Sequence, residues 1–161
     1  MLSYVLALFK IVTTGSSLLK VIVDTNILVA ALLGKEAGAA RKIIELSMEG
    51  ALSPLVGEAL FNEYLDVLAR NDVMHKCPLD GDERLEFLSA FLACCQWCKI
   101  YFGWRPNLRD EGDNHLIELA VAGGAHYIIT SNVRDLRNGE LAFDELKVVT
   151  PQQFIKESPW V

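Results

Sequence analysis

A carboxylate, a hydroxyl and an amide interrupt the most apolar part of the chain. The run "VIVDTNILVAALL", residues 21–33, carries Asp24, Thr25 and Asn26 between two hydrophobic stretches. Burying an unpaired carboxylate costs several kcal/mol, which is comparable with the whole stability of a domain. Asp24 therefore needs compensation, either as the cap of the helix that follows or as part of a functional site.

Further acidic and amide side chains are expected at the same edge of a sheet. Asp113 opens a predicted helix, and Asp110 lies one turn earlier in the chain. Thr130 and Asn132 follow a predicted strand, and Asp135 lies three residues further on. Because the working crevice of an open parallel sheet lies at the carboxyl ends of its strands, these groups should converge near the end of the first strand.

Such a set of oxygen-bearing side chains indicates a particular chemistry. A cluster of carboxylates is self-repelling unless a cation occupies it or the groups share protons. Oxygen ligands without histidine or cysteine select hard ions such as Mg²⁺ or Mn²⁺. An ion of this kind can activate a water molecule and stabilise charge on a phosphodiester. The residue types around Asp24 therefore indicate that a metal ion compensates its buried charge.

Each acidic residue also has a purely structural explanation. Asp24 and Asp113 could be helix N-caps, a role that aspartate commonly fills. Asn26 could tie down its loop by hydrogen bonds. Glu63 could be a solvated carboxylate in the middle of a helix, and the remaining carboxylates could belong to loops. The residue pattern leaves both explanations open.

Other kinds of site lack the necessary residues. Cys95 and Cys98 have CxxC spacing, but no second pair completes a zinc site, and buried thiols in a reduced cytosol are the better explanation. His115 and His126 are interpreted as surface or structural residues, because no partner histidine is spaced to join them in a metal site. The chain has no GxGxxG, GxxxxGK[ST] or GxSxG motif. A phosphoryl-transfer domain would rest on Asp24 alone, with no suitably placed lysine or second aspartate.

Alternating strands and helices must position these groups. Continuous β-branched runs and helical periodicity predict strands at 20–24, 51–53, 97–102, 126–130 and 147–150 and helices at 25–33, 39–50, 54–70, 79–95, 113–125 and 151–158. Residues 104–113 and 131–141 are expected to form loops. This order predicts an α/β fold with a mostly parallel sheet.

Length and composition predict one domain. The chain has 161 residues, of which 52% are hydrophobic. Residues 1–18 are interpreted as an extension outside the fold, which leaves a single domain over 19–161. The apolar part of this extension is interrupted by Lys10 and is too short to span a membrane, and no charged segment precedes it as in a signal peptide. We therefore expect a cytoplasmic protein with no membrane partner.

The charge balance limits the kinds of partner. The formal net charge is −6, and a protein held on nucleic acid by a broad basic surface would need clustered lysine and arginine. An enzyme that meets nucleic acid through a local metal site remains compatible with this charge. An acidic surface also suits a basic protein partner.

Four segments in this order resemble the PIN-domain family over roughly residues 20 to 156. They are "VIVDTNILVAALL", "GEALFNEYLDVLAR", "LRDEGDNHLIELAVAGGAHYIITSNVRDL" and "KVVTPQQFI". The likeness is greatest to bacterial PIN proteins that are toxin components of toxin–antitoxin pairs. The resemblance implies a three-layer α/β/α sandwich with a central parallel sheet and an acidic, Mg²⁺- or Mn²⁺-dependent nuclease site.

The resemblance also assigns catalytic residues. The first aspartate of the family corresponds to Asp24 and its helical glutamate to Glu63. The aspartate at the start of the helix expected over 113–125 corresponds to Asp113. At the fourth position many PIN domains have aspartate where this chain has Asn132, which brings one negative charge less. Asp135 could supply that charge instead.

The leading hypothesis is a metal-dependent endoribonuclease that cleaves single-stranded RNA, the toxin of a type II toxin–antitoxin pair. Asp24 and Asp113 would hold the ion, with Glu63 and Asn132 completing the catalytic set. The supporting residues would be Thr25, Asn26, Asp110, Thr130 and Asp135. A separate antitoxin and a homodimer formed through helices around 54–70 and 85–95 are the expected partners. The alternative is a PIN-like module that binds RNA or protein with weak or no turnover.

Overall fold

Short, largely buried strands pair side by side in one direction. The computed structural model describes residues 18–34, 38–100, 114–137 and 144–158. Within these ranges the strands are β1 (Leu19–Val23), β2 (Leu52–Val56), β3 (Gln96–Trp97), β4 (Tyr127–Ile129) and β5 (Lys147–Val149). They lie in the order β3-β2-β1-β4-β5, and each neighbouring pair is parallel. The predicted parallel α/β sheet is confirmed.

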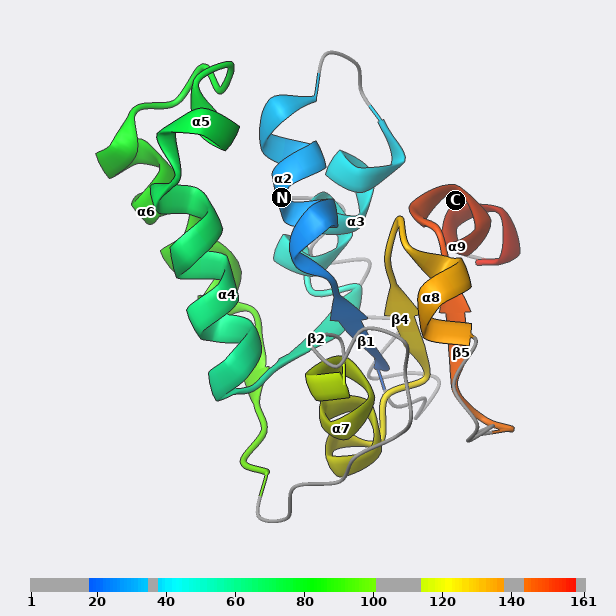
Figure 1. Ribbon diagram of the computed structural model, residues 1–161. Coiled ribbons are helices and arrows are strands. Elements are labelled where there is room, and N and C mark those ends of the chain that lie inside the picture. Colours follow the sequence, from blue (N-terminus) through cyan, green and yellow to red (C-terminus); the bar gives the residue numbers. More distant parts are fainter. Residues whose placement is uncertain (1–17, 35–37, 101–113, 138–143, 159–161) are drawn as a thin grey trace.

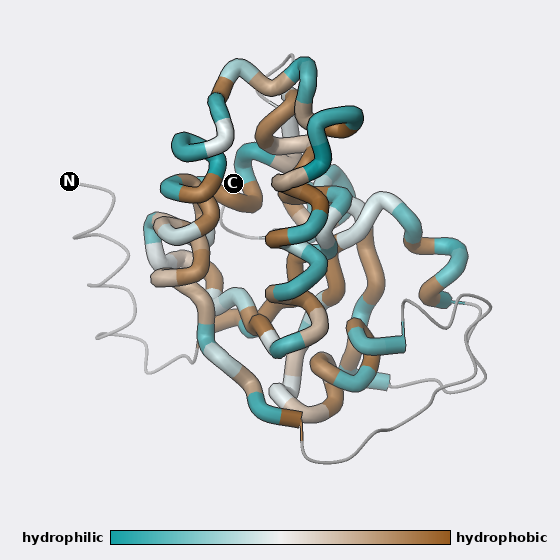
Figure 2. Tube along the Cα trace, turned by 60° about the vertical axis from the view of Figure 1, so that its left-hand side comes forward, coloured by the Kyte–Doolittle hydropathy of each residue, from teal (hydrophilic) through white to brown (hydrophobic). Residues whose placement is uncertain are grey.

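The central strand β1 forms the middle of the hydrophobic core. Val21, Ile22 and Val23 are completely buried, as expected for a parallel strand that helices cover on both faces. Figure 2 shows the strands as mostly brown, hydrophobic segments inside the fold, whereas hydrophilic residues are frequent along the outer helices. This burial explains why the run from residue 20 to 23 contains no polar side chain beyond Lys20.

Helices cover both faces of the sheet and complete three layers (Figure 1). They are α2 (Thr25–Leu33), α3 (Ala39–Met48), α4 (Glu58–Ala69), α5 (Asn71–Met74), α6 (Gly81–Ala93), α7 (Asn114–Gly123), α8 (Val133–Arg137) and α9 (Pro151–Glu157). Helix α7 packs on β1, β2 and β4, while α3 packs on β2 and beside α9 on the opposite face. Helix α4 contacts α2, α6 and α7. The three-layer α/β/α sandwich agrees with expectation.

The prediction of a helix start at Ser53-Pro54 is wrong. These residues belong to β2, where Pro54 lies opposite Val21, and α4 begins only at Glu58. Burial favours a strand over a helix here, because the side chains of Leu52, Leu55 and Val56 fill the core. Strand β3 pairs with β2 only at Leu55 and Val56 in the described part of the chain, so the prolyl nitrogen lies where β2 has one neighbour.

The expectation of a loop over 131–141 is wrong for residues 133–137, which form α8. Leu136 anchors this helix in the core with 4% exposure, and Arg137 Nη2 donates a 2.7 Å hydrogen bond to the Val148 carbonyl. The short helix α5 was also not expected, and its buried Met74 explains why the chain turns inward there. In both places tertiary packing orders a polar segment. The strand expected over 97–102 is reduced to Gln96–Trp97, and residues 101 and 102 lie outside the described ranges.

None of the helices in the described ranges has the length and apolar character to cross a bilayer.

Tyr64 attaches α4 to the end of β1. Its hydroxyl donates a hydrogen bond to the carbonyl oxygen of Val23, and its ring lies edge-to-face with Phe91 at 6.0 Å between centroids. Tyr64 is 1% exposed, so water cannot replace the lost donor if the hydroxyl is removed. The neighbouring residue Glu63 is thereby held at a defined place relative to β1.

We predict that Tyr64→Phe lowers the free energy of unfolding by about 1–3 kcal/mol, because a buried carbonyl loses its partner. Urea unfolding measures the change. Tyr127→Phe is the matched control, since the Tyr127 hydroxyl makes no hydrogen bond to any described residue, and it should change stability by less than about 0.5 kcal/mol. Equal effects of the two substitutions would contradict the role given to the Tyr64 hydroxyl.

Candidate functional site

Asp24 ends β1 and starts α2. The pairing of Val23 with Ile129 continues beyond the strand, because the Asp24 amide donates a 3.0 Å hydrogen bond to the Ile129 carbonyl. Asp24 is the N-cap of α2, and its Oδ1 accepts a 2.7 Å hydrogen bond from the Thr25 amide. The capping explanation is therefore correct, and it uses one of the two carboxylate oxygens.

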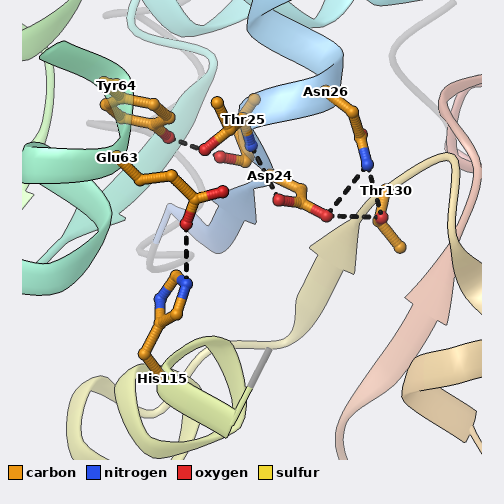
Figure 3. Close-up of polar contacts among 8 residues, drawn as sticks. Asp24, Thr25, Asn26, Glu63, Tyr64, His115 and Thr130 are labelled. Atoms are coloured by element: carbon orange, nitrogen blue, oxygen red, sulfur yellow. Dashed lines mark hydrogen bonds and ion pairs between the residues drawn. The ribbon is translucent and has the colours of Figure 1, made fainter. Parts of the chain in front are cut away.

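The second oxygen of Asp24 faces polar groups from the end of β4 (Figure 3). Its Oδ2 accepts a 2.7 Å hydrogen bond from the Thr130 hydroxyl and a 3.1 Å bond from the Asn26 amide. The Asn26 side-chain oxygen in turn accepts a hydrogen bond from the backbone amide of Ser131. The backbone amide of Asn132 donates a 3.0 Å hydrogen bond to Thr130 Oγ1. These contacts place three predicted site residues (Asn26, Thr130 and Asn132) around Asp24.

Burial dominates the electrostatics of Asp24. The residue is 6% exposed, and no lysine or arginine forms an ion pair with it in the described part of the chain. Loss of hydration raises the pKa of the Asp24 carboxyl, the bonds from Thr130 and Thr25 oppose this rise, and the nearby charge of Glu63 adds to it. The hydrogen bonds therefore compensate the buried charge only in part.

Glu63 lies across the site on α4 and is paired with a histidine from α7. Its Oε2 is 2.8 Å from Nε2 of His115, and the side chains are 42% and 17% exposed respectively. The hydrogen bond from His115 lowers the pKa of the Glu63 carboxyl, against the smaller opposing effect of partial burial. His115 was expected to be structural or at the surface and was not assigned to the site. Its place at the start of the helix that follows Asp113 was the signal available in the sequence.

The Thr25 hydroxyl is a buried polar atom without a regular hydrogen bond. Its Oγ1 has no partner of ordinary geometry among the described residues, although it is close enough to Glu63 to help lower that carboxyl's pKa. Asp24, Thr25, Asn26, Glu63 and Asn132 line one cleft of about 410 Å³, whose remaining described lining consists of Val29, Val67 and Val73. Oxygen donors thus meet in a space that apolar side chains border.

This donor set fits a hard cation but is incomplete. Two carboxylates and an unpartnered hydroxyl are the ligand types that Mg²⁺ and Mn²⁺ prefer. No group of three or more histidine, cysteine, aspartate or glutamate side chains that could hold a metal occurs within 18–34, 38–100, 114–137 and 144–158. Asp110 and Asp113 lie outside these ranges. Asp135 lies on α8 and is not among the described residues that line the cleft.

Comparisons with known proteins agree with this architecture. The sequence model of a family described as PIN domain matches residues 20–134. A similar fold occurs in a chain of the crystal structure of VapBC2 from Rickettsia felis bound to a DNA fragment from their promoter. The two chains are 17% identical with a TM-score of 0.51, and the match covers 81% of this chain and 97% of that chain. At this identity the likeness is evidence for the fold alone. A comparison with curated proteins gives no match.

We predict that the metal-free protein loses the stabilising contribution of Asp24 as pH rises. The folded-state pKa of Asp24 lies above its usual value of 3.8, so this contribution is full below pH 3.8 and is lost as pH rises through the folded-state pKa. Asp24→Asn removes this loss, and its stability relative to the native protein should therefore increase between pH 4 and pH 7.

Urea unfolding in EDTA at several pH values measures the difference in the free energy of unfolding between Asp24→Asn and the native protein. Glu63 is present in both proteins, so its opposite contribution cancels. Glu86→Gln, at an exposed position in the middle of α6, is the control for removal of a surface charge. A stability difference between Asp24→Asn and the native protein that is the same at every pH would show that the Asp24 charge carries no burial cost.

Proposed function

Since the chain belongs to the PIN-domain family, we propose that it is a metal-dependent endoribonuclease that cleaves single-stranded RNA. PIN domains are generally nucleases that use divalent metal ions. The observation that carries the proposal is the cleft at the carboxyl end of the sheet, where Asp24 and Glu63 lie beside the buried Thr25 hydroxyl. The domain responsible is proposed to extend over residues 19–161.

Asp24 and Asp113 are proposed to hold Mg²⁺ or Mn²⁺. Asp113 directly precedes Asn114, the first residue of the helix whose His115 contacts Glu63. When bound, the ion would supply Lewis-acid activation of water and would neutralise charge on the phosphodiester. A cation would also remove the repulsion between two carboxylates that lie in one cleft.

The other site residues would position the reactants. Thr130 and Asn26 fix the orientation of the Asp24 carboxylate through the hydrogen bonds described above. Glu63, kept ionised by the hydrogen bond from His115, would add negative charge that helps to hold the ion. The Thr25 hydroxyl and the exposed Asn132 amide would orient the phosphate. Asp110 and Asp135 are proposed to add negative charge at the margin of the site.

Asn132 supports a second candidate function. It lines the cleft at the position where many PIN domains have aspartate, so the site has one negative charge less for a metal ion. A module that binds RNA or protein without turnover would tolerate this amide. The two functions differ in one observable, since the binding module cleaves no RNA at any concentration of Mg²⁺ or Mn²⁺.

An antitoxin partner is proposed from the comparison and from charge. The structural neighbour VapBC2 is bound to a promoter DNA fragment, and the formal net charge of −6 of this chain suits a basic protein partner. We therefore propose that the chain is the toxin of a type II toxin–antitoxin pair and acts in the cytoplasm.

We predict that the protein cleaves a mixed single-stranded RNA with Mn²⁺ or Mg²⁺ and not with EDTA. Asp24→Asn/Asp113→Asn should reduce cleavage to the EDTA level, while the exposed Asp82→Asn should cleave like the native protein. Gel analysis of labelled RNA measures the products, and calorimetry with Mn²⁺ measures metal binding. Cleavage that survives the double substitution would contradict the assignment. Binding of RNA without any cleavage would favour the binding module.

We also predict a homodimer, which light scattering would report as a mass near twice the 17.9 kDa of one chain. Leu85 on α6 is 49% exposed and belongs to the proposed interface, so Leu85→Glu should shift the protein toward monomer. Val121→Glu, at a similarly exposed residue on α7, should leave the dimer intact. A strict monomer at micromolar concentration would refute the proposal.

A further inference from the structure

A second cleft, of about 690 Å³, is lined by the two helices that carry Glu63 and His115. Helix α4 contributes Glu58, Ala59 and Asn62, α7 contributes Glu118, and the segment from β3 onward contributes Trp97, Cys98, Lys99 and Ile100. The proposed nuclease chemistry uses none of these side chains.

Trp97 is exposed and held in place. It is 55% exposed, which is the largest value among the exposed large hydrophobic residues of the described ranges. Its backbone pairs with Val56, the next amide (Cys98) donates a 2.8 Å bond to the Val56 carbonyl, and its ring meets Phe61 edge-to-face at 5.9 Å. An aromatic ring fixed in this way loses little conformational entropy when a flat ligand stacks on it.

The polar groups of the cleft select a base rather than a phosphate. Glu58, Glu118 and Lys99 all line it, so the carboxylates outnumber the ammonium group and the cleft disfavours a phosphodiester. The same carboxylates accept hydrogen bonds from the exocyclic amino groups of nucleobases, as glutamate does from cytosine. Asn62 adds an amide that can both donate and accept. A base with an amino group therefore fits this cleft better than uracil, which has none.

Two helices connect this cleft with the proposed catalytic site. Ala59 lies four residues before Glu63 on α4, and Glu118 lies three residues after His115 on α7, so each pair shares a helix face. One helical turn, about 5.4 Å, separates the members along each axis. The 2.8 Å contact between Glu63 and His115 thus joins α4 and α7 about one helical turn from residues that line the second cleft.

We propose that this second cleft is a base-binding subsite for single-stranded RNA, in which Trp97 stacks on an unpaired base and Glu118 accepts a hydrogen bond from its amino group. The inference rests on the proposed function, since it places this base on the same RNA strand as the proposed cleavage site. It assigns to the chain a preference for bases that carry an amino group.

The test is binding of fluorescein-labelled oligocytidylate and oligouridylate of equal length, measured by anisotropy in EDTA so that no cleavage occurs. The native protein should bind oligocytidylate more tightly than oligouridylate. Trp97→Ala should weaken binding about 5- to 100-fold, as expected for loss of one stacked base, while Trp97→Phe should retain most of it. Glu118→Ala should reduce the preference for oligocytidylate.

Val121→Ala is the matched control, because Val121 is an exposed apolar residue of α7 that does not line the cleft, and it should bind like the native protein. Urea unfolding of each variant separates loss of binding from loss of fold. Unchanged affinity in Trp97→Ala, or absence of RNA binding by the native protein, would overturn the subsite. Cleavage with Mn²⁺ is measured separately. A native protein that binds RNA through Trp97 without cleaving it supports the subsite and refutes the nuclease. Cleavage that Trp97→Ala leaves unchanged refutes only the subsite.

Discussion

The lateral pairing of β1 with β4 is the constraint on which the site depends. It brings the residue after each strand, Asp24 and Thr130, to a separation of 2.7 Å between carboxylate and hydroxyl oxygens. Both residues are buried, so their hydrogen bond acts in a medium of low dielectric constant, where polar interactions are stronger than in water. The same carboxylate begins α2. Sheet, helix and site are therefore joined at one side chain.

Two carboxylates of one cleft have their pKa values moved in opposite directions. Burial favours the protonated form of Asp24, whereas His115 favours the ionised form of Glu63. Such a division is typical of sites in which two similar groups perform different tasks. The two carboxylates also differ in how far a nearby positive charge already stabilises them. Asp24 forms no ion pair with a described residue, so a cation would stabilise it more than Glu63, which is already paired with His115.

Much of the fold and part of the site could be predicted from the sequence because they depend on short-range patterns. Asp24 and Thr130 directly follow apolar strands, Asn132 lies two residues after Thr130, and parallel strands place their carboxyl ends together. His115 could not be found in this way, since its contact with Glu63 depends on how α4 and α7 pack. Pro54 was misassigned because proline after serine occurs both at helix starts and in strands, and only burial distinguishes them. The parts assigned to Asp110 and Asp113 stay predictions, because these residues lie outside the described ranges.

The bond between Asp24 and Thr130 connects residues 106 positions apart, and this separation has a consequence for synthesis. A ribosome releases Asp24, Glu63 and the strands β1 to β3 well before β4 is made. Until then β1 has a neighbour on one side only, and Asp24 has no hydroxyl to fix its second oxygen. Contacts of such long range form late in folding because the loop between them must close first. An unfinished chain therefore contains the acidic residues of the cleft but not the packing that brings them together. The site assembles only when most of the chain has been synthesised.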